Sequence, residues 1–398
     1  MWFLAVSLLI LVASTYQINH GNLGDLSNDL SSFLTWKKNF NVTYTTQVEH
    51  DRRFQVFQDN CKLLNAIRKL AIDSTATFGF TRFMDWTHED KMASLSWNQN
   101  PDAKPIPNQD PRAKRSSAPP PPTFDWRNQN GNNYISPVAD QGKCGSCYAF
   151  ASTAVVESQM VINNPSKFLN QSYTCLLIFT CYKNVYPNQS EQQLVSCATQ
   201  TTQATEVYNG QNWNIAYKSY GCSGGSVINM YDYIKSNGQD SETVYPYSNA
   251  TYNNQNNGSC SPQNPQTTSP AGARLTNYWT VSGEQNIASQ VASTGPVAYA
   301  IWFPWANSNS SMWYYTGGVY QPLSGECPGQ TWTPNQSWGW PGHMLTFVGY
   351  NLTANPPYWI AKNSWGPNWG INGYINWYYG NGQCAMYNWA HAATAYSY

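Results

Sequence analysis

The sequence predicts an α+β protein in which a helical N-terminal unit precedes a larger domain with a helical half and a strand-rich half. A single helical stripe lies within residues 25–95. A second, apolar helix is expected to start at Cys147, in a helical half covering about 123–235. The later half holds short runs of strand-like composition, at 297–301, 344–350, 358–362 and 373–377. Helices and strands are thus expected in separate halves, which is typical of the α+β class.

The composition and the N-terminus limit the function. The 398 residues include 21 Lys and Arg against 21 Asp and Glu, so nucleic acid is not expected as the main partner. Residues 2–13 are apolar, which fits a secretory signal at 1–16 and is too short for a membrane span. We expect no membrane contact after its removal. Ten cysteines agree with a disulfide-bonded product in a lysosome, a vacuole or the extracellular space. Eight N-x-[ST] sequons add the expectation of glycosylation, at Asn41, Asn170, Asn188, Asn249, Asn257, Asn309, Asn335 and Asn351.

Residues 17–95 are expected to form one unit, called the prosegment below. Six of its residues are spaced four, four, three, four and four apart and share one helix face: Glu49, Arg53, Phe57, Asn60, Leu64 and Arg68. This stripe resembles the ERFNIN pattern of cathepsin L-like propeptides, with Leu and Arg at its last two positions. A second set resembles their G-x-N-x-F-x-D motif: Gly79, Thr81, Phe83 and Asp85. The resemblance implies an inhibitor, covalently part of the chain, that covers the active-site cleft.

A linker is expected at 96–122, because the proline run 119–122 is extended and basic residues at 112–115 precede it. Exposed segments of this kind are where processing proteases cut. The sequence at 123–127 resembles the start of a mature papain-like enzyme, so we expect the peptidase domain at 123–398.

The stretch from Gln141 to Phe150 carries the strongest chemical signal. Cys147 is expected at a helix N-terminus, where the helix dipole favours the nucleophilic thiolate. The Gln141 side chain, six residues upstream, can donate to an oxyanion near the same sulfur. Cys-Gly-Ser-Cys-Tyr at 144–148 resembles the nucleophile motif of papain-type cysteine peptidases.

The general base follows by elimination. The chain has five histidines, at His20, His50, His88, His343 and His391, and the prosegment holds the first three. His343 borders the strand-like run 344–350, which would hold it rigidly, whereas His391 has no such frame. Asn363-Ser-Trp365-Gly resembles the N-S-W-G motif of the same family. The resemblance implies that Asn363 orients the imidazole and that Trp365 shields that contact from water.

Cysteine counting alone leaves the pairing open. Without Cys147 and the prosegment residue Cys61, eight cysteines remain, which allow 105 connectivities. The family resemblance selects three pairs, Cys144–Cys222, Cys197–Cys260 and Cys327–Cys384. Cys175 and Cys181 are left to pair locally, and Cys61 is expected to pack as a small apolar residue.

The spacing departs from the family pattern. His343 follows Cys147 by 343 − 147 = 196 residues, against roughly 130–150 in papain-type enzymes. We expect insertions as polar surface loops, at 159–189, 199–220 and 328–341.

Other chemistries fit single motifs only. Gly-Cys-Ser-Gly-Gly at 221–225 satisfies the serine-hydrolase pattern G-x-S-x-G but lacks its strand–turn–helix context. The C-x-x-C at 144–147 could be a redox or zinc half-site, but this would leave the histidine and asparagine motifs unexplained. An inactive, secreted papain-fold binding glycoprotein stays open as a non-enzymatic alternative. Tyr148 in place of Trp resembles dipeptidyl peptidase I, so an exopeptidase is a further alternative.

The sequence therefore predicts a two-lobed papain-like fold, with a helical left lobe, a β-barrel-like right lobe and a helical prosegment. The function expected is that of a monomeric cysteine endopeptidase made as a zymogen, acting on protein and peptide substrates without metal or cofactor. Substrate backbone is expected along Gly224 and Gly225, which lack a Cβ. By motif alignment, the pocket for the second residue before the scissile bond is lined by Val227, Ala300, Met344 and Trp389. Without an acidic residue, this pocket should prefer Val or Leu to Phe or Arg.

Overall fold

The structure is a computed structural model. It describes residues 28–72, 74–96, 103–106, 119–169, 171–175, 179–208, 211–248, 260, 272–305, 309–327, 342–380, 382, 384 and 390–397. The expected signal peptide at 1–16 and the third expected insertion at 328–341 lie outside these residues. Within the described part of the chain, no helix has the length and apolar character needed to cross a membrane.

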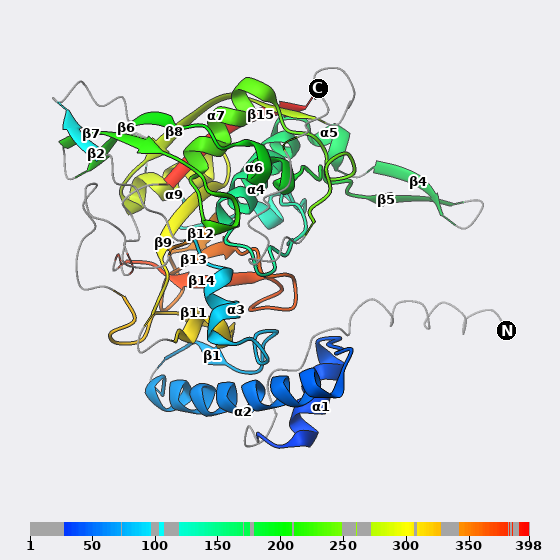
Figure 1. Ribbon diagram of the computed structural model, residues 1–398. Coiled ribbons are helices and arrows are strands. Elements are labelled where there is room, and N and C mark those ends of the chain that lie inside the picture. Colours follow the sequence, from blue (N-terminus) through cyan, green and yellow to red (C-terminus); the bar gives the residue numbers. More distant parts are fainter. Residues whose placement is uncertain are drawn as a thin grey trace.

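Two helices and a short third one form the prosegment, and the remaining helices lie in the peptidase domain (Figure 1). The α-helices are α1 (Leu30–Asn39), α2 (Gln47–Leu70), α3 (His88–Ala93), α4 (Cys147–Asn163), α5 (Pro165–Phe168), α6 (Glu191–Cys197), α7 (Val227–Asn237) and α9 (Glu284–Ser293). Short 3-10 turns are η1 (Trp126–Asn128), η2 (Gly221–Ser223) and η3 (Ser311–Tyr314).

Helix α2 confirms the predicted stripe. Thr46 caps it by accepting a hydrogen bond from the Glu49 backbone N–H, and the helix then runs for 24 residues. Phe57 and Leu64 are fully buried, and they belong to the same apolar cluster as Phe33 and Trp36 of α1. Cys61 is a buried free thiol, as expected. The stripe thus holds α1, α2 and the following segment together as one unit.

The strands are β1 (Thr77–Phe78), β2 (Ala103–Ile106), β3 (Thr123–Asp125), β4 (Gln171–Cys175), β5 (Phe179–Lys183), β6 (Thr202–Tyr208), β7 (Gln211–Tyr217), β8 (Ala273–Val281), β9 (Val297–Trp302), β10 (Tyr315–Gly317), β11 (Val319–Tyr320), β12 (Gly342–Asn351), β13 (Tyr358–Lys362), β14 (Tyr374–Tyr378) and β15 (Ala390–Ser397). All four strand-like runs predicted from composition coincide with strands, β9, β12, β13 and β14. The prediction succeeded there because these runs are apolar and β-branched or aromatic.

One large sheet forms the strand-rich lobe. Its strands follow the order β11-β14-β13-β12-β9-β15-β8, and β3 pairs with β12 beside this path. In the described residues β11 and β8 stand at opposite ends, so the expected barrel-like lobe is not closed. The last strand, β15, also packs on α4 and carries the sheet into the helical lobe.

Two expected loops are in fact β-hairpins. Strands β4 and β5 lie within the first insertion and project from the domain, and β6 and β7 lie within the second (Figure 1). The linker is also not entirely structureless, because its strand β2 pairs with β7. Polar composition indicated surface exposure correctly but not strand pairing, because pairing depends on a partner segment.

Candidate active site

Cys147 is the first residue of α4, and almost every residue of this helix is buried. The loop before it is fixed by the disulfide between Cys144 and Cys222, with an S–S distance of 2.08 Å. Gly145 donates its N–H to the Cys222 carbonyl at 2.9 Å. A Cβ at Gly145 would lie 2.6 Å from that carbonyl oxygen and closer still to the Leu95 oxygen of the prosegment. The close packing of this loop against Cys222 and the prosegment therefore requires glycine at position 145.

His343 lies on β12, and Asn363 directly follows the neighbouring strand β13. The His343 Nε2 atom lies 2.8 Å from Asn363 Oδ1, and both side chains are buried. Trp365 stacks on the imidazole, with ring centroids 4.7 Å apart. His343 Nδ1 has no hydrogen-bond partner in the described residues. The ring is therefore held by one nitrogen and leaves the other free for a reacting group.

The sulfur of Cys147 faces the strand that carries His343. The backbone N–H of Met344, the next residue in β12, forms a hydrogen bond that favours the thiolate of Cys147. His391, the other histidine of the peptidase domain, lies on β15, where its ring approaches Thr280 at 3.4 Å. This geometry favours His343 over His391 as the partner of the cysteine.

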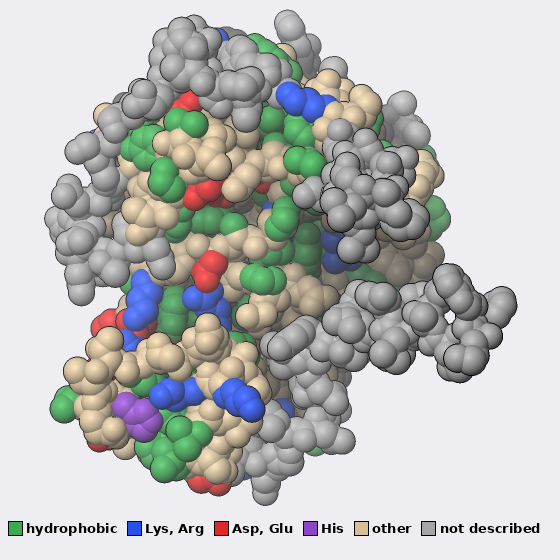
Figure 2. Space-filling model, turned by 90° about the vertical axis from the view of Figure 1, so that its right-hand side faces the viewer, with side chains coloured by type: hydrophobic (Ala, Val, Ile, Leu, Met, Phe, Trp, Pro, Cys, Tyr) green, Lys and Arg blue, Asp and Glu red, His purple; other side chains and the backbone are tan. Residues whose placement is uncertain are grey.

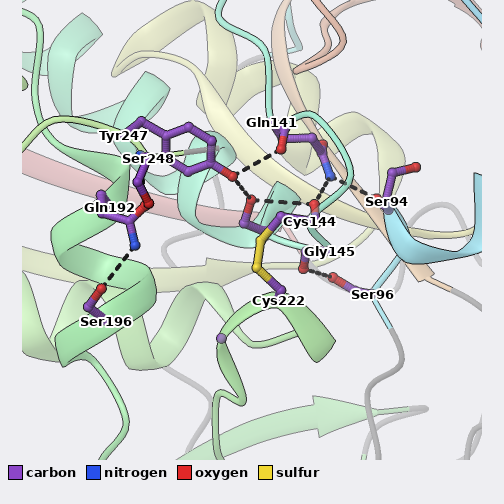
Figure 3. The surroundings of a disulfide bond; sticks show 12 residues. Ser94, Ser96, Gln141, Cys144, Gly145, Gln192, Ser196, Cys222, Tyr247 and Ser248 are labelled. Carbon is purple, nitrogen blue, oxygen red and sulfur yellow. Dashed lines mark hydrogen bonds between the residues drawn. A yellow bond between two sulfur atoms is a disulfide. The ribbon is translucent and has the colours of Figure 1, made fainter. Parts of the chain in front are cut away.

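The Gln141 amide is already engaged. Its Nε2 donates to the Ser94 carbonyl at 2.7 Å and to the Cys144 carbonyl at 2.8 Å. Ser364 Oγ donates to Gln141 Oε1 at 2.5 Å and fixes the orientation of the amide. Figure 3 shows Gln141 beside the disulfide, with Ser94 on its prosegment side. Sequence reasoning did not assign a role to Ser364, although it follows Asn363 directly in the recognised motif.

The chain passes directly over the nucleophile where the prosegment ends and the expected linker begins. Ser96 Oγ lies 3.1 Å from Cys147 Sγ and donates to the Gly145 carbonyl at 3.0 Å. Ser96 also pairs with Gly342 through two backbone hydrogen bonds, of 3.0 and 2.8 Å. No sequence signal marks Ser94 or Ser96, because their position depends on how the prosegment docks.

The buried site holds both reacting groups neutral. Burial raises the pKa of the Cys147 thiol, although hydrogen bonds from Ser96 and Met344 favour its charged form. Burial likewise lowers the pKa of His343 to about 4, against the hydrogen bond to Asn363. In this covered state, burial outweighs the hydrogen bonds that favour the thiolate of Cys147. The thiolate predicted from the helix dipole stays a prediction for the uncovered enzyme.

Aromatic rings and ion pairs fasten the prosegment. Phe83 packs edge-to-face on Trp313 and Trp365, at centroid distances of 4.8 and 5.1 Å. Lys143, in the loop before Cys147, donates to Asp90 of the prosegment at 2.6 Å. The described ion pairs also include Arg82 with Asp140 across the same boundary. Figure 2 shows acidic and basic side chains gathered where the prosegment meets the rest of the molecule.

The predicted substrate pocket is placed in part. Ala300 and Met344 are paired across β9 and β12. Val227 begins α7, in a buried cluster against which Met344 packs. Gly224 has a φ of 113°, and a Cβ at Gly225 would lie 2.7 Å from the Tyr148 ring. The remaining expected member, Trp389, lies outside the described residues.

The structure forms the three disulfides that the family resemblance selected, Cys144–Cys222, Cys197–Cys260 and Cys327–Cys384. Cys175 and Cys181 lie on the paired strands β4 and β5, where they face Phe179 and Tyr173 in the register. Their side chains lie outside the described part of the structure, so this pair stays a prediction.

A buried polar cluster near the site was not predicted. Lys362, next to Asn363, donates to Ser136 Oγ at 3.0 Å, and Ser136 donates to Glu157 of α4. Burial lowers the pKa of Lys362 and raises the pKa of Glu157. Together with Glu191 these residues line a cavity of about 410 Å³. The described residues contain no group of three or more His, Cys, Asp or Glu side chains arranged to hold a metal.

Known proteins resemble this chain along most of its length. Residues 120–394 match the family described as papain family cysteine protease, and residues 33–90 match the cathepsin propeptide inhibitor domain. Cysteine proteinase 1 of Dictyostelium discoideum is 28% identical over 393 residues, covering 96% of this chain and 97% of that protein. Pro-cathepsin H of Bos taurus is 28% identical, covering 89% of this chain and 87% of that protein.

A solved structure agrees with the sequence comparisons. The digestive procathepsin L2 proteinase from Tenebrio molitor larval midgut matches with a TM-score of 0.64 and 28% identity, covering 92% of this chain and 99% of that chain. The papain-family match covers more than half of the chain, and the propeptide match precedes it in the order expected of a precursor. The chain therefore belongs to the papain family of cysteine proteases and is the proenzyme form of a cysteine-type peptidase.

Proposed function

We propose that the protein is a secreted or lysosomal cysteine endopeptidase with Cys147 as nucleophile, His343 as acid and base, Asn363 as orienting group and Gln141 as oxyanion donor. One observation carries this proposal. The hydrogen bond between Asn363 and His343 uses Nε2 and leaves His343 Nδ1 without a partner among the described residues. The next residue of the same strand, Met344, forms a backbone hydrogen bond to the Cys147 sulfur. A peptidase of this class needs such a cysteine, an imidazole within reach and a third group that orients the imidazole.

The proposed reaction begins when the prosegment leaves. Water then reaches the site, so the burial that keeps Cys147 and His343 neutral is removed and the ion pair can form. The Cys147 thiolate attacks the peptide carbonyl, and protonated His343 gives its proton to the leaving amine. Water, activated by neutral His343, then releases the acyl group from the sulfur.

Oxyanion stabilisation is assigned to Gln141 and the Cys147 backbone N–H. In the precursor, Gln141 Nε2 donates to the Ser94 carbonyl, and we take this oxygen to occupy the position of the developing oxyanion. Ser364 holds the amide in place after Ser94 has left. Trp365 covers the Asn363–His343 contact and, with Trp313, would then offer an apolar surface to the leaving group.

Maturation is proposed to remove residues 1–122. Strand β3 begins at Thr123 and pairs with Gly349–Asn351 of β12, so a cut before Thr123 leaves this strand in the sheet. The mature enzyme is proposed to act as a monomer, without nucleic acid, membrane or cofactor as partners. The pocket at Ala300 and Met344 is proposed to accept Val or Leu. We expect Arg to bind poorly there, because none of the residues assigned to the pocket is acidic and could pair with its charge.

The nucleophile can be tested by covalent labelling. The precursor is activated at acidic pH, treated with an epoxide-type cysteine-protease inhibitor and digested to locate the modified residue. We expect the label on Cys147, and Cys147→Ala should lose labelling and peptide cleavage. Cys61→Ala changes the other free thiol among the described residues and controls for effects on folding and processing of the precursor. It should keep labelling and cleavage, because Cys61 leaves with the prosegment. Near wild-type turnover by Cys147→Ala would contradict the proposal.

A further inference from the structure

The second insertion builds a hairpin that is anchored to the peptidase domain. It consists of β6 and β7, and its base is tied to α7 by Asn229. The Asn229 Nδ2 group donates to the Gln200 carbonyl at 2.7 Å and to the Tyr217 carbonyl at 3.0 Å. Ile215 of β7 is fully buried in the main apolar cluster. The hairpin is therefore part of the folded domain, although its sequence indicated only a surface loop.

One edge of this hairpin is filled by the precursor itself. Strand β2 of the linker pairs antiparallel with β7, from Ala103 opposite Ile215 to Ile106 opposite Asn212. The sheet order β2-β7-β6 makes β7 central in the precursor, with β6 on the side of α7. Pro105 has no N–H to donate, so β2 forms fewer ladder bonds than an unrestricted strand. When prosegment and linker leave, the outer edge of β7 loses its partner.

The chain that fills this edge also covers the nucleophile. Ser96 lies against Cys147, and β2 begins only 103 − 96 = 7 residues later. Seven residues span at most about 25 Å in extended form. On the peptidase side, β7 ends at Tyr217 and leads within seven residues to Gly224, where the Tyr220 N–H bonds the Gly224 carbonyl at 2.8 Å. The edge of β7 therefore lies within reach of an extended chain that crosses Cys147.

We infer that the vacated edge of β7 is a second binding site for polypeptide substrates, which takes up extended backbone about seven to ten residues before the scissile bond. The prosegment runs from Trp313 and Trp365, on the leaving-group side, across Cys147 and on to β7. A substrate whose acyl side reaches β7 runs in the opposite direction, so it would pair parallel to β7, whereas β2 pairs antiparallel. This inference rests on the proposed peptidase function and assigns it a substrate class: long, unfolded chains rather than short peptides. Unpaired strand edges bind extended peptides through main-chain hydrogen bonds, with little dependence on side chains. The linker strand shows the kind of occupant that the edge accepts.

The test uses the mature, unmodified enzyme, so no variant has to fold. Two fluorogenic substrates share the sequence around the scissile bond and carry four or eleven residues before it. We expect kcat/KM to be about tenfold higher for the long substrate, and a long substrate with alternating prolines should lose this gain. N-methylation of single backbone amides in the extension should reduce the gain at every second position, which is the signature of strand pairing.

A competitor gives an independent readout. A synthetic peptide with the sequence of residues 99–110 should raise KM for the long substrate and leave the short one unaffected. Equal cleavage of both substrates, or equal inhibition of both, would overturn the inference while leaving the peptidase proposal intact. Dimerisation of the mature enzyme through this edge would overturn it as well. Absence of thiol-dependent cleavage of the short substrate would instead refute the proposed function.

Discussion

Asp90 offers a sharp test of how the prosegment is held. In the described residues, two ion pairs cross from the prosegment to the loop before Cys147, and one of them joins Asp90 to Lys143 at 2.6 Å. Asp90 also accepts from Arg53 within the prosegment at 2.5 Å. We expect Asp90→Asn to weaken the docking of the prosegment without unfolding it. The amide oxygen can still accept from the Thr87 N–H, and the Thr87 hydroxyl still accepts from the backbone N–H of residue 90, so the capping box of α3 is kept.

The magnitude follows from burial. A hydrogen bond between charged groups contributes about 1.5–3 kcal/mol when sheltered. The Asp90 side chain is 17% exposed and that of Lys143 31%, so solvent screening reduces this to about 1–2 kcal/mol. The prosegment of the variant should therefore open about five to thirty times more often than that of the wild type.

The effect should depend on pH in a defined direction. Burial favours the neutral acid, but hydrogen bonds from Lys143 and Arg53 outweigh it and lower the pKa of Asp90. A lowered pKa in the folded state contributes stability above the unfolded value of about 3.9, and this contribution is lost as pH falls through the folded value. The difference between Asp90→Asn and the wild type should thus be full at neutral pH and shrink below about pH 4.

The assay is the rate at which an epoxide-type inhibitor labels Cys147 in the intact precursor at neutral pH. The matched control is Asp59→Asn, the same change in an exposed prosegment pair with Lys62. Lys143→Gln completes a double-mutant cycle that isolates the contact across the boundary. Equal labelling of Asp90→Asn and Asp59→Asn, or strict additivity with Lys143→Gln, would refute the reasoning.

Three further predictions concern the site and the maturation of the precursor. Ser364→Ala should lower kcat about tenfold with little change in KM, because Gln141 loses the donor that orients it; unchanged kcat would remove Ser364 from the mechanism. N-terminal sequencing of the active form should begin near Thr123, and an active enzyme that keeps the prosegment would contradict zymogen control. Peptide libraries should show Val or Leu favoured over Arg at the second residue before the scissile bond, by about 10–200-fold, and Met344→Glu should reverse this order.

Local chemistry explains why much of the site could be predicted. A cysteine at a helix start, a histidine at a strand edge and the Asn363-Ser-Trp motif are each encoded within a few residues. The helical stripe from Glu49 to Arg68 is equally local, because the helix period alone places its members on one face. The helix period alone was sufficient to place the stripe, whereas the roles of Cys147, His343 and Asn363 also needed the family resemblance and stay predictions.

Only the tertiary structure decided which distant segments contact these residues. The Ser96 hydroxyl contacts the Cys147 sulfur, and the Ser94 carbonyl accepts a hydrogen bond from the Gln141 amide. Strand β2 pairs with β7, which lies more than a hundred residues later in the sequence. The neutral state of Cys147 and His343 in the precursor also comes from the covering chain, which removes water and penalises both charges. The sequence by itself therefore predicted which groups are the candidates to react. The docking of distant segments decided that these groups are covered, because desolvation and strand pairing depend on neighbours that no local pattern records.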